Sequence, residues 1–203
     1  MAEALNLNRK EQILSVSSKL FREKGFATAT MRDVANVLGI EAASIYHHFK
    51  SKEEILELIC FGMAEKFLTA MKEVNDIYFN AAEKLQMAVR AHVAIITANP
   101  DQSAVFLNDW KSLPEPKLSA FHNIRHAYES EFRLIVKHGK EEDIFSDVDE
   151  KFAALIILSA VNWIYQWYSP QGKMKPEEIA DHLSAFILSG LRKKLVTDLH
   201  YKP

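Results

Sequence analysis

The chain contains 203 residues, 48% of them apolar and 26% charged, which is sufficient for one large or two small folded domains. No apolar run reaches the length of a membrane-spanning helix, and the first residues, Met-Ala-Glu, lack the apolar core of a signal peptide. We therefore expect a cytoplasmic protein with no membrane partner. The single cysteine, Cys60, excludes an internal disulfide and a zinc site built from several cysteines.

Charge is divided unevenly along the chain. Residues 1–52 contain eight Lys and Arg against five Asp and Glu, a net charge of +3, whereas residues 53–203 contain 17 against 22, a net charge of −5. A basic end on an acidic body is expected of a protein that touches nucleic acid with that end only. Because a single head with a charge of +3 attracts DNA weakly, we expect two heads to act together.

The N-terminal segment predicts short helices with well-defined ends. Asn8 can cap a first helix that ends near residue 25. Thr30 can cap a second helix, with Asp33 three residues later in a capping-box arrangement. Gly39 follows this helix at the position where a left-handed residue commonly ends one.

A third short helix, from residues 41–44 onward, places Ile45 and Phe49 on a buried side. Two short helices joined by a tight turn predict a helix-turn-helix, whose second helix enters the DNA major groove. Tyr46, His47 and Lys52 offer hydrogen-bond donors to phosphate oxygens, although Tyr46 and His48 can alternatively pack against the first helix. The candidate DNA-binding residues are Thr30, Arg32, Ala42, Ala43, Ser44, Tyr46, His47, His48, Lys50 and Lys52.

Residues 9–59 resemble the DNA-binding domain of the TetR family of bacterial repressors. Three motifs carry the resemblance in order: a first helix ending in F-R-E-K-G-F, the run T-M-R-D-V-A, and the run I-Y-H-H-F-K-S-K. Glu41 departs from the small or polar residue of many members, and its carboxylate can repel phosphate or accept from a cytosine amino group. The resemblance implies a helix-turn-helix domain over residues 1–52 and a helical ligand-binding and dimerisation domain over residues 53–203.

The rest of the chain shows helical periodicity and no sustained strand alternation, so the predicted fold class is all-α. Ser51 and Glu54 predict another capping box, Gly139 is predicted to end a helix, and Pro176 to begin the last one. The helices are expected over residues 51–71, 81–98, 101–111, 118–138, 149–168 and 176–191.

The segment from Asp149 to Tyr168 is apolar on almost every side, so it must be covered on every side. A second copy of the chain is the simplest cover, and the resemblance implies pairing through the last two helices in a four-helix bundle. The alternative is that both helices form the core of a monomer. The predicted homodimer interface contains Trp163, Trp167, Leu183, Phe186, Ile187 and Leu191.

A ligand site is predicted on residues 118–138, where Arg125 interrupts an apolar stripe. A buried guanidinium needs a partner, which is either Glu129 one turn later or an anionic ligand. His122 and His126 can hold a metal together with His92 and Glu129, but such spacing is common by chance, and we expect no metal and no cofactor. The candidate ligand-binding residues are Phe106, Trp110, Phe121, Arg125, Tyr128, Asn162 and Tyr165.

Residues 160–191 resemble a TetR branch that responds to acyl-CoA thioesters in lipid or steroid catabolism, although many relatives have Arg where this chain has Gln166. The resemblance implies a repressor that leaves its operator when a small effector, such as an acyl-CoA, binds. No catalytic constellation is visible, which argues against the alternative of a small-molecule-binding enzyme with an incidental helix-turn-helix. The acidic body argues against a further alternative, a ligand-independent DNA-architectural protein.

Overall fold

The computed structural model describes residues 8–193, and within this range the chain is helical, as predicted. The only β-type pairing in these residues is an isolated bridge between Phe145 and Arg192. None of the helices in this range is long and apolar enough to cross a membrane. The elements are α1 (Arg9–Lys24), α2 (Met31–Leu38), α3 (Ala42–Tyr46), α4 (Lys52–Asp76), α5 (Ala81–Ala98), α6 (Pro100–Asn108), the 3-10 helix η2 (Trp110–Ser112), α7 (Lys117–Glu141), α8 (Glu150–Asn162), α9 (Ile164–Trp167) and α10 (Pro176–Leu191).

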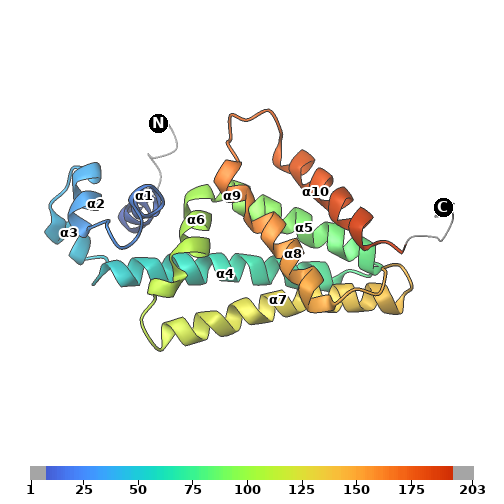
Figure 1. The fold of residues 1–203 in the computed structure, drawn as a ribbon. Coiled ribbons are helices and arrows are strands. Elements are labelled where there is room, and N and C mark those ends of the chain that lie inside the picture. Colours follow the sequence, from blue (N-terminus) through green and yellow to red (C-terminus); the bar gives the residue numbers. More distant parts are fainter. Residues whose placement is uncertain (1–7, 194–203) are drawn as a thin grey trace, which may run out of the picture.

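Helices α1, α2 and α3 gather at one end of the long helix α4, and α5, α6 and α7 pack along the rest of α4 (Figure 1). Asn8 caps α1 in a complete capping box with Glu11. Thr30 and Asp33 form the predicted box at the start of α2, and Gly39 ends that helix at φ 65°, in the left-handed region. The cap at Asn8, the capping box of Thr30 and the glycine at the end of α2 are therefore formed as predicted.

The predicted capping box at the start of α4 is only half formed. Ser51 Oγ accepts a hydrogen bond from the Glu54 backbone N–H at 3.3 Å, as expected. The Glu54 carboxylate, however, accepts from the Lys50 backbone N–H at 2.6 Å rather than from Ser51. The Glu54 carboxylate thus binds the backbone N–H of the residue before the N-cap, whereas in a capping box it binds the N–H of the N-cap itself.

Several predicted helix boundaries are wrong. Helix α4 continues past the predicted residue 71 to Asp76, and the predicted helix over residues 101–111 is divided into α6 and η2. Helix α7 continues through Gly139 to Glu141. The glycine does not end the helix. It leaves room for the ring of Phe145, which a Cβ at this position would overlap. The predicted helix over residues 149–168 is divided at Trp163 into α8 and the short α9. Helix α10 begins at Pro176, as predicted.

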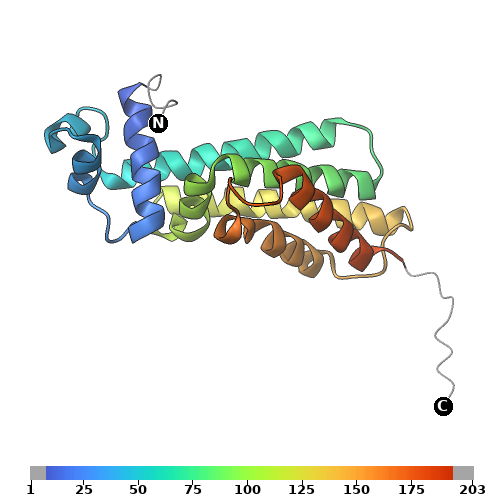
Figure 2. The same cartoon turned by 90° about the horizontal axis from the view of Figure 1, so that it is seen from above.

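The body is a bundle in which α5 packs against both α4 and α10, while α7 packs against α4 and α8. Helices α8 and α10 run along one side of this bundle, away from α4 (Figure 2). The core contains fully buried rings such as Phe121 and Phe132, and the buried Phe67 of α4 packs against Phe106 and Tyr128. One outer side of the body is thus formed by the two last long helices.

Candidate nucleic-acid interface and internal cavity

The N-terminal head consists of α1, α2 and α3, and most of the predicted DNA-binding residues lie on α2 and α3 or next to them. Ile45 and Phe49, at 0% and 1% exposure, fix α3 and the turn that follows it to the head core. Tyr46 is 54% exposed, and His48 is also exposed, so neither is buried against α2, the first helix of the helix-turn-helix. Of the other predicted DNA-binding residues, Thr30, Arg32, Ala43, His47 and Lys50 are exposed, while Ala42, Ser44 and Lys52 are half-buried.

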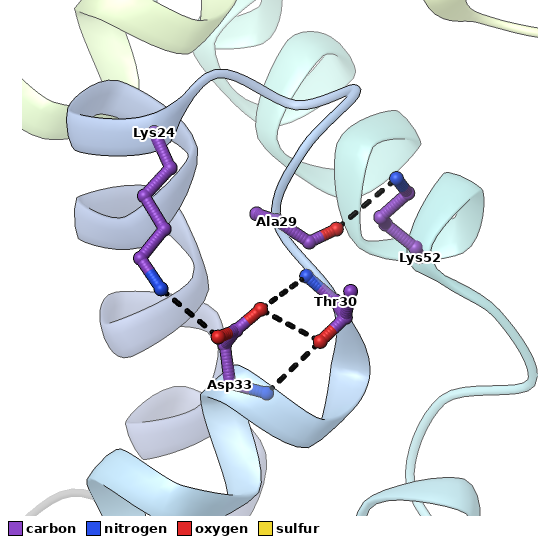
Figure 3. A network of polar contacts seen from close by, with 5 residues as sticks. All are labelled: Lys24, Ala29, Thr30, Asp33 and Lys52. Carbon is purple, nitrogen blue, oxygen red and sulfur yellow. Dashed lines mark hydrogen bonds and ion pairs between the residues drawn. The ribbon is translucent and has the colours of Figure 1, made fainter.

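The Lys52 ammonium group forms hydrogen bonds to the loop between α1 and α2. Its Nζ donates to the backbone carbonyls of Phe26 at 2.8 Å, Ala27 at 3.3 Å and Ala29 at 3.1 Å. Figure 3 shows the contact to Ala29, which joins the first turn of α4 to the loop before α2. An ammonium has three N–H donors, so these carbonyls use all of them, and the predicted phosphate contact of Lys52 has no free donor. Sequence reasoning missed this structural role.

Thr30 and Asp33 form a polar network at the start of α2 that reaches α1 (Figure 3). The Thr30 hydroxyl donates to Asp33 Oδ2 at 2.6 Å, and Lys24 Nζ lies 2.9 Å from Asp33 Oδ1. The Thr30 hydroxyl, followed by Lys24, lowers the pKa of Asp33 to about 2. The Asp33 carboxylate is therefore ionised at neutral pH and connects α2 to Lys24 of α1. The Thr30 hydroxyl is used in capping α2.

A cavity of about 360 Å³ lies inside the body, lined by side chains of α4, α5, α6, η2, α7 and α8. Five of the seven predicted ligand-binding residues line it: Phe106, Trp110, Arg125, Tyr128 and Asn162. The other two do not line the cavity as it stands. Phe121 is fully buried behind Phe106 and Trp110, and the Tyr165 hydroxyl donates to Asn108 Oδ1 at 2.8 Å.

Arg125 enters the cavity without a carboxylate partner. Its guanidinium carbon lies 4.9 Å from the centre of the Trp110 ring and 6.0 Å from that of Phe106. Glu129, the alternative partner predicted from the sequence, forms its ion pair with Arg133 instead, and no described residue forms an ion pair with Arg125. Burial lowers the pKa of Arg125, but a guanidinium remains charged in proteins. The cavity thus contains a cation held by aromatic faces.

His92 lies at the inner side of the cavity and is 2% exposed. Its Nδ1 lies 2.9 Å from the Tyr128 hydroxyl and its Nε2 lies 3.0 Å from Asn162 Oδ1. Burial lowers the pKa of His92 to about 3, so the ring is neutral at physiological pH. Because both ring nitrogens have side-chain partners, His92 does not complete the alternative metal site with His122 and His126.

Helix α6 separates this cavity from the head. Phe106 faces the cavity, whereas Asp101, at the start of the same helix, accepts from Arg22 of α1 at 2.9 Å. Just after α6, burial raises the pKa of Asp109, and a hydrogen bond from the Phe26 backbone opposes that rise. A shift of α6 in response to cavity contents would therefore reach α1 directly.

The helices α8, α9 and α10 expose several large apolar side chains. Phe186 is 78% exposed and Trp163 is 61% exposed, with Trp167 at 49%. Ile187 and Leu191 are each 8% exposed, because α10 turns them inward within the protomer, and Leu183 is half-buried. Of the predicted interface residues, only the aromatic ones are thus strongly exposed. Helix α8 also exposes Phe152 and Ile156, which the sequence prediction did not include.

Two family models match the chain. Residues 13–59 match the bacterial regulatory proteins of the tetR family, and residues 79–191 match the tetracyclin repressor-like C-terminal domain. The chain belongs to the TetR family. The exposed face of α2 and α3 is therefore the helix-turn-helix surface of a TetR-family transcriptional regulator.

Similar proteins of known name agree with this assignment. The HTH-type transcriptional repressor KstR2 of Mycobacterium tuberculosis is 25% identical over 189 residues, covering 92% of this chain and 94% of the relative. Its structure, described as a ketosteroid transcriptional regulator, superposes with a TM-score of 0.88 over 92% of this chain and 96% of that chain. The TetR-family regulator PfmR from Thermus thermophilus is 32% identical, with a TM-score of 0.80 over 92% and 100%.

A third solved structure shares the fold at lower identity. AibR, crystallised in complex with isovaleryl coenzyme A and operator DNA, is 23% identical, with a TM-score of 0.77 over 88% of this chain and 97% of that chain. The KstR2 relatives, from Mycobacterium tuberculosis and Rhodococcus jostii, are named as transcriptional repressors.

Proposed function

We propose that this TetR-family regulator is a homodimeric repressor that leaves its operator when an amphipathic anion, of the acyl-CoA class, enters the cavity. The observation that carries the proposal is Arg125. Its charge faces a cavity that Glu129 also lines, and it is stacked on Trp110; Glu129 forms its ion pair with Arg133, and no described residue forms an ion pair with Arg125. A buried cation without a counter-charge is costly, and an anionic or strongly polar ligand group offsets that cost.

The volume of the cavity is consistent with part of such a ligand. About 360 Å³ lies at the lower end of the range of small-molecule pockets, sufficient for a ring or short chain but not for a whole coenzyme A. The nucleotide part would then remain outside, beyond the exposed side chains of His122 and His126 that line the same cavity. The isovaleryl coenzyme A complex of AibR, a fold relative, supports this ligand class.

The apolar outer side of α8 to α10 supports the homodimer. Phe186, Trp163 and Phe152, all more than half exposed, form a surface that a monomer leaves in water. Closed two-fold pairing buries the same patch on both copies. It also brings two heads, each with a charge of +3, to one DNA molecule, which gives the affinity that one head lacks.

Within this proposal, residues 1–52 form the DNA-binding domain and residues 53–203 form the ligand-binding and dimerisation domain, with α4 and α6 connecting them. Ligand binding would favour a body shape in which α6 and α4 move the heads out of register with successive major grooves. To release most of the protein, the ligand must prefer that shape by several kcal/mol, about 5 for a near-complete shift.

The test combines binding with release. Purified protein is mixed with a fluorescent copy of its upstream DNA, and acyl-CoAs of varied chain length and ring type are titrated while anisotropy is recorded. We expect at least one thioester to release the DNA and to raise the melting temperature of the free protein, while coenzyme A alone is weaker.

Two variants on α7 connect this release to the cavity. Arg125→Ala should weaken the response to the active thioester by tenfold or more, because the ligand loses its cationic partner. Lys137→Ala is the matched control, since this exposed lysine of the same helix pairs only with the exposed Glu141. A protein that holds its operator against every thioester would favour the ligand-independent architectural alternative, and an unchanged response in Arg125→Ala would show that the anchor is another residue.

A further inference from the structure

The inner side of the cavity carries a group of three hydrogen-bonding side chains, one from each of three helices. His92 of α5 lies between Tyr128 of α7 and Asn162 of α8, at distances of 2.9 Å and 3.0 Å. The ring of Phe67 covers His92, with ring centres 4.5 Å apart. Tyr128 and Asn162 both line the cavity, so a ligand that enters it lies beside these two side chains.

The chemistry of the three groups determines which atom donates each proton. Asn162 Oδ1 can only accept, so His92 Nε2 carries the proton of this hydrogen bond. A neutral imidazole has one N–H, which leaves a lone pair on Nδ1. The Tyr128 hydroxyl must therefore donate to Nδ1. The order of donation runs from Tyr128 to His92 and from His92 to Asn162.

This order of donation determines which donors and acceptors remain available to a ligand. The Asn162 amide nitrogen has two N–H donors, and no described residue accepts from it. The Tyr128 oxygen has given its proton to His92 and retains lone pairs, so it offers an acceptor. The inner side of the cavity thus presents donors from α8 and an acceptor from α7.

We propose that the acyl part of the effector carries an oxygen, as a ketone or a hydroxyl, which accepts a hydrogen bond from Asn162. A hydroxyl group can in addition donate to Tyr128. This inference rests on the proposed function, because it specifies the acyl group of the same ligand. A plain hydrocarbon in this position would cover the Asn162 amide without offering it an acceptor, and sites built to bind a polar group discriminate strongly against analogues that lack it.

The experiment uses four thioesters that differ only at the ring: cyclohexanecarboxyl-CoA, its 3-oxo and 4-oxo derivatives, and its 4-hydroxy derivative. Each is titrated calorimetrically into the full-length protein without DNA. We expect at least one oxygenated compound to bind tenfold or more tightly than the unsubstituted ring. Equal binding of all four, or no binding by any of them, would overturn the inference. The proposed acyl-CoA function is decided separately, by the wider titration of acyl-CoAs against operator DNA.

Three variants assign the preference to its residues. Asn162→Leu should reduce the preference for the oxygenated ring to about twofold or less, while it retains or improves binding of the unsubstituted ring. Tyr128→Phe should remove any advantage of the hydroxyl over the ketone. Ser159→Ala is the matched control, because Ser159 also lines the cavity but its hydroxyl donates to the Leu155 carbonyl at 2.7 Å. An undiminished preference in Asn162→Leu would refute the assignment, and the wild-type comparison decides the inference even if a variant fails to fold.

Discussion

Arg22 of α1 and Asp101 of α6 are joined by an ion pair of 2.9 Å that connects the DNA-binding head to the wall of the cavity. Both side chains are about one-third exposed, so the pair contributes little to stability, about 0.2–1 kcal/mol. Its position gives it greater significance, because the helix that holds Asp101 also places Phe106 in the cavity. The pair is therefore a candidate for coupling ligand binding to the orientation of the head.

We expect Asp101→Asn to leave ligand binding and operator binding nearly unchanged and to reduce the ratio between operator affinities without and with ligand. The reason is that α6 can then move without pulling α1. Titrations of DNA in the presence and absence of a saturating thioester measure this ratio. Glu23→Gln is the control, because it removes an exposed pair within α1, to Lys19, that does not reach α6. A ratio equal to that of wild type would exclude this pair from the coupling.

The exposed side of α3 and the turn after it should contact phosphate. Lys50→Met should weaken operator binding and reduce the slope of log affinity against log salt by about one for each phosphate that this lysine neutralises. Tyr46→Ala, at a residue that is 54% exposed, should also weaken binding but should leave the salt slope unchanged. Anisotropy titrations at four salt concentrations give both quantities. If neither variant changes affinity at physiological salt, this surface is not the one that reads DNA.

Lys52 should behave differently from Lys50, although the two are two residues apart. Lys52→Met removes the donor to three backbone carbonyls, so we expect the free energy of unfolding of the head to fall by about 1–3 kcal/mol. Lys50→Met should change it by less than about 0.5 kcal/mol, as surface substitutions usually do. Chemical denaturation followed by circular dichroism compares the two variants. Equal stability of both proteins would mean that water replaces the Lys52 hydrogen bonds without cost.

Phe186→Asp should produce monomers that retain their fold and melting temperature, because the side chain is 78% exposed in the protomer and is covered only in the proposed dimer. Ile187→Asp, one residue later, places a charge where the side chain is 8% exposed, so it should destabilise the protomer itself. Sedimentation velocity at micromolar concentration and thermal melting separate the two effects. A wild-type protein that sediments as a monomer would contradict the dimer.

His92 should make the protein less stable in mild acid. Its pKa is lowered to about 3 in the fold, so below the usual value near 6.5 the unfolded chain binds a proton that the folded chain does not. Stability is therefore lost as the pH falls from about 6.5 toward 3, by about 1.4 kcal/mol per pH unit where only the unfolded chain is protonated.

Denaturation at several pH values between 6.5 and 4.5 measures this slope above the main carboxylate range. His92→Gln should flatten it, whereas His47→Gln, at an exposed ring, should not. An identical slope in His92→Gln would show that the lost stability comes from other groups.

Local sequence signals predicted the head well because its helix ends are decided by nearby residues. The boxes of Asn8 with Glu11 and of Thr30 with Asp33 each act across three positions, and Gly39 acts alone. The stripe around Arg125 placed Arg125 and Tyr128 together at the cavity, because a helical period determines which side chains share a face.

The features that were missed depend on contacts across the fold. Lys52 bonds to carbonyls more than 20 positions earlier, and His92 meets partners 36 and 70 positions later. Gly139 was mistaken for a helix end because the ring of Phe145, which requires the missing Cβ, is placed there by tertiary packing. Composition on its own did not show which apolar residues of α10 face inward.

The Lys52 hydrogen bonds also have a mechanical consequence. Because these hydrogen bonds join the loop before α2 to the first turn of α4, we expect the helix-turn-helix surface and that end of α4 to move as one unit. Helix α4 has 25 residues and is therefore a rod of about 37 Å, so pivoting it by about 5° at its far end displaces the near end by about 3 Å. In a dimer the displacements of the two heads add. A rotation of α4 that is too small to disturb the core thus moves each head by a distance comparable to the spacing between base pairs.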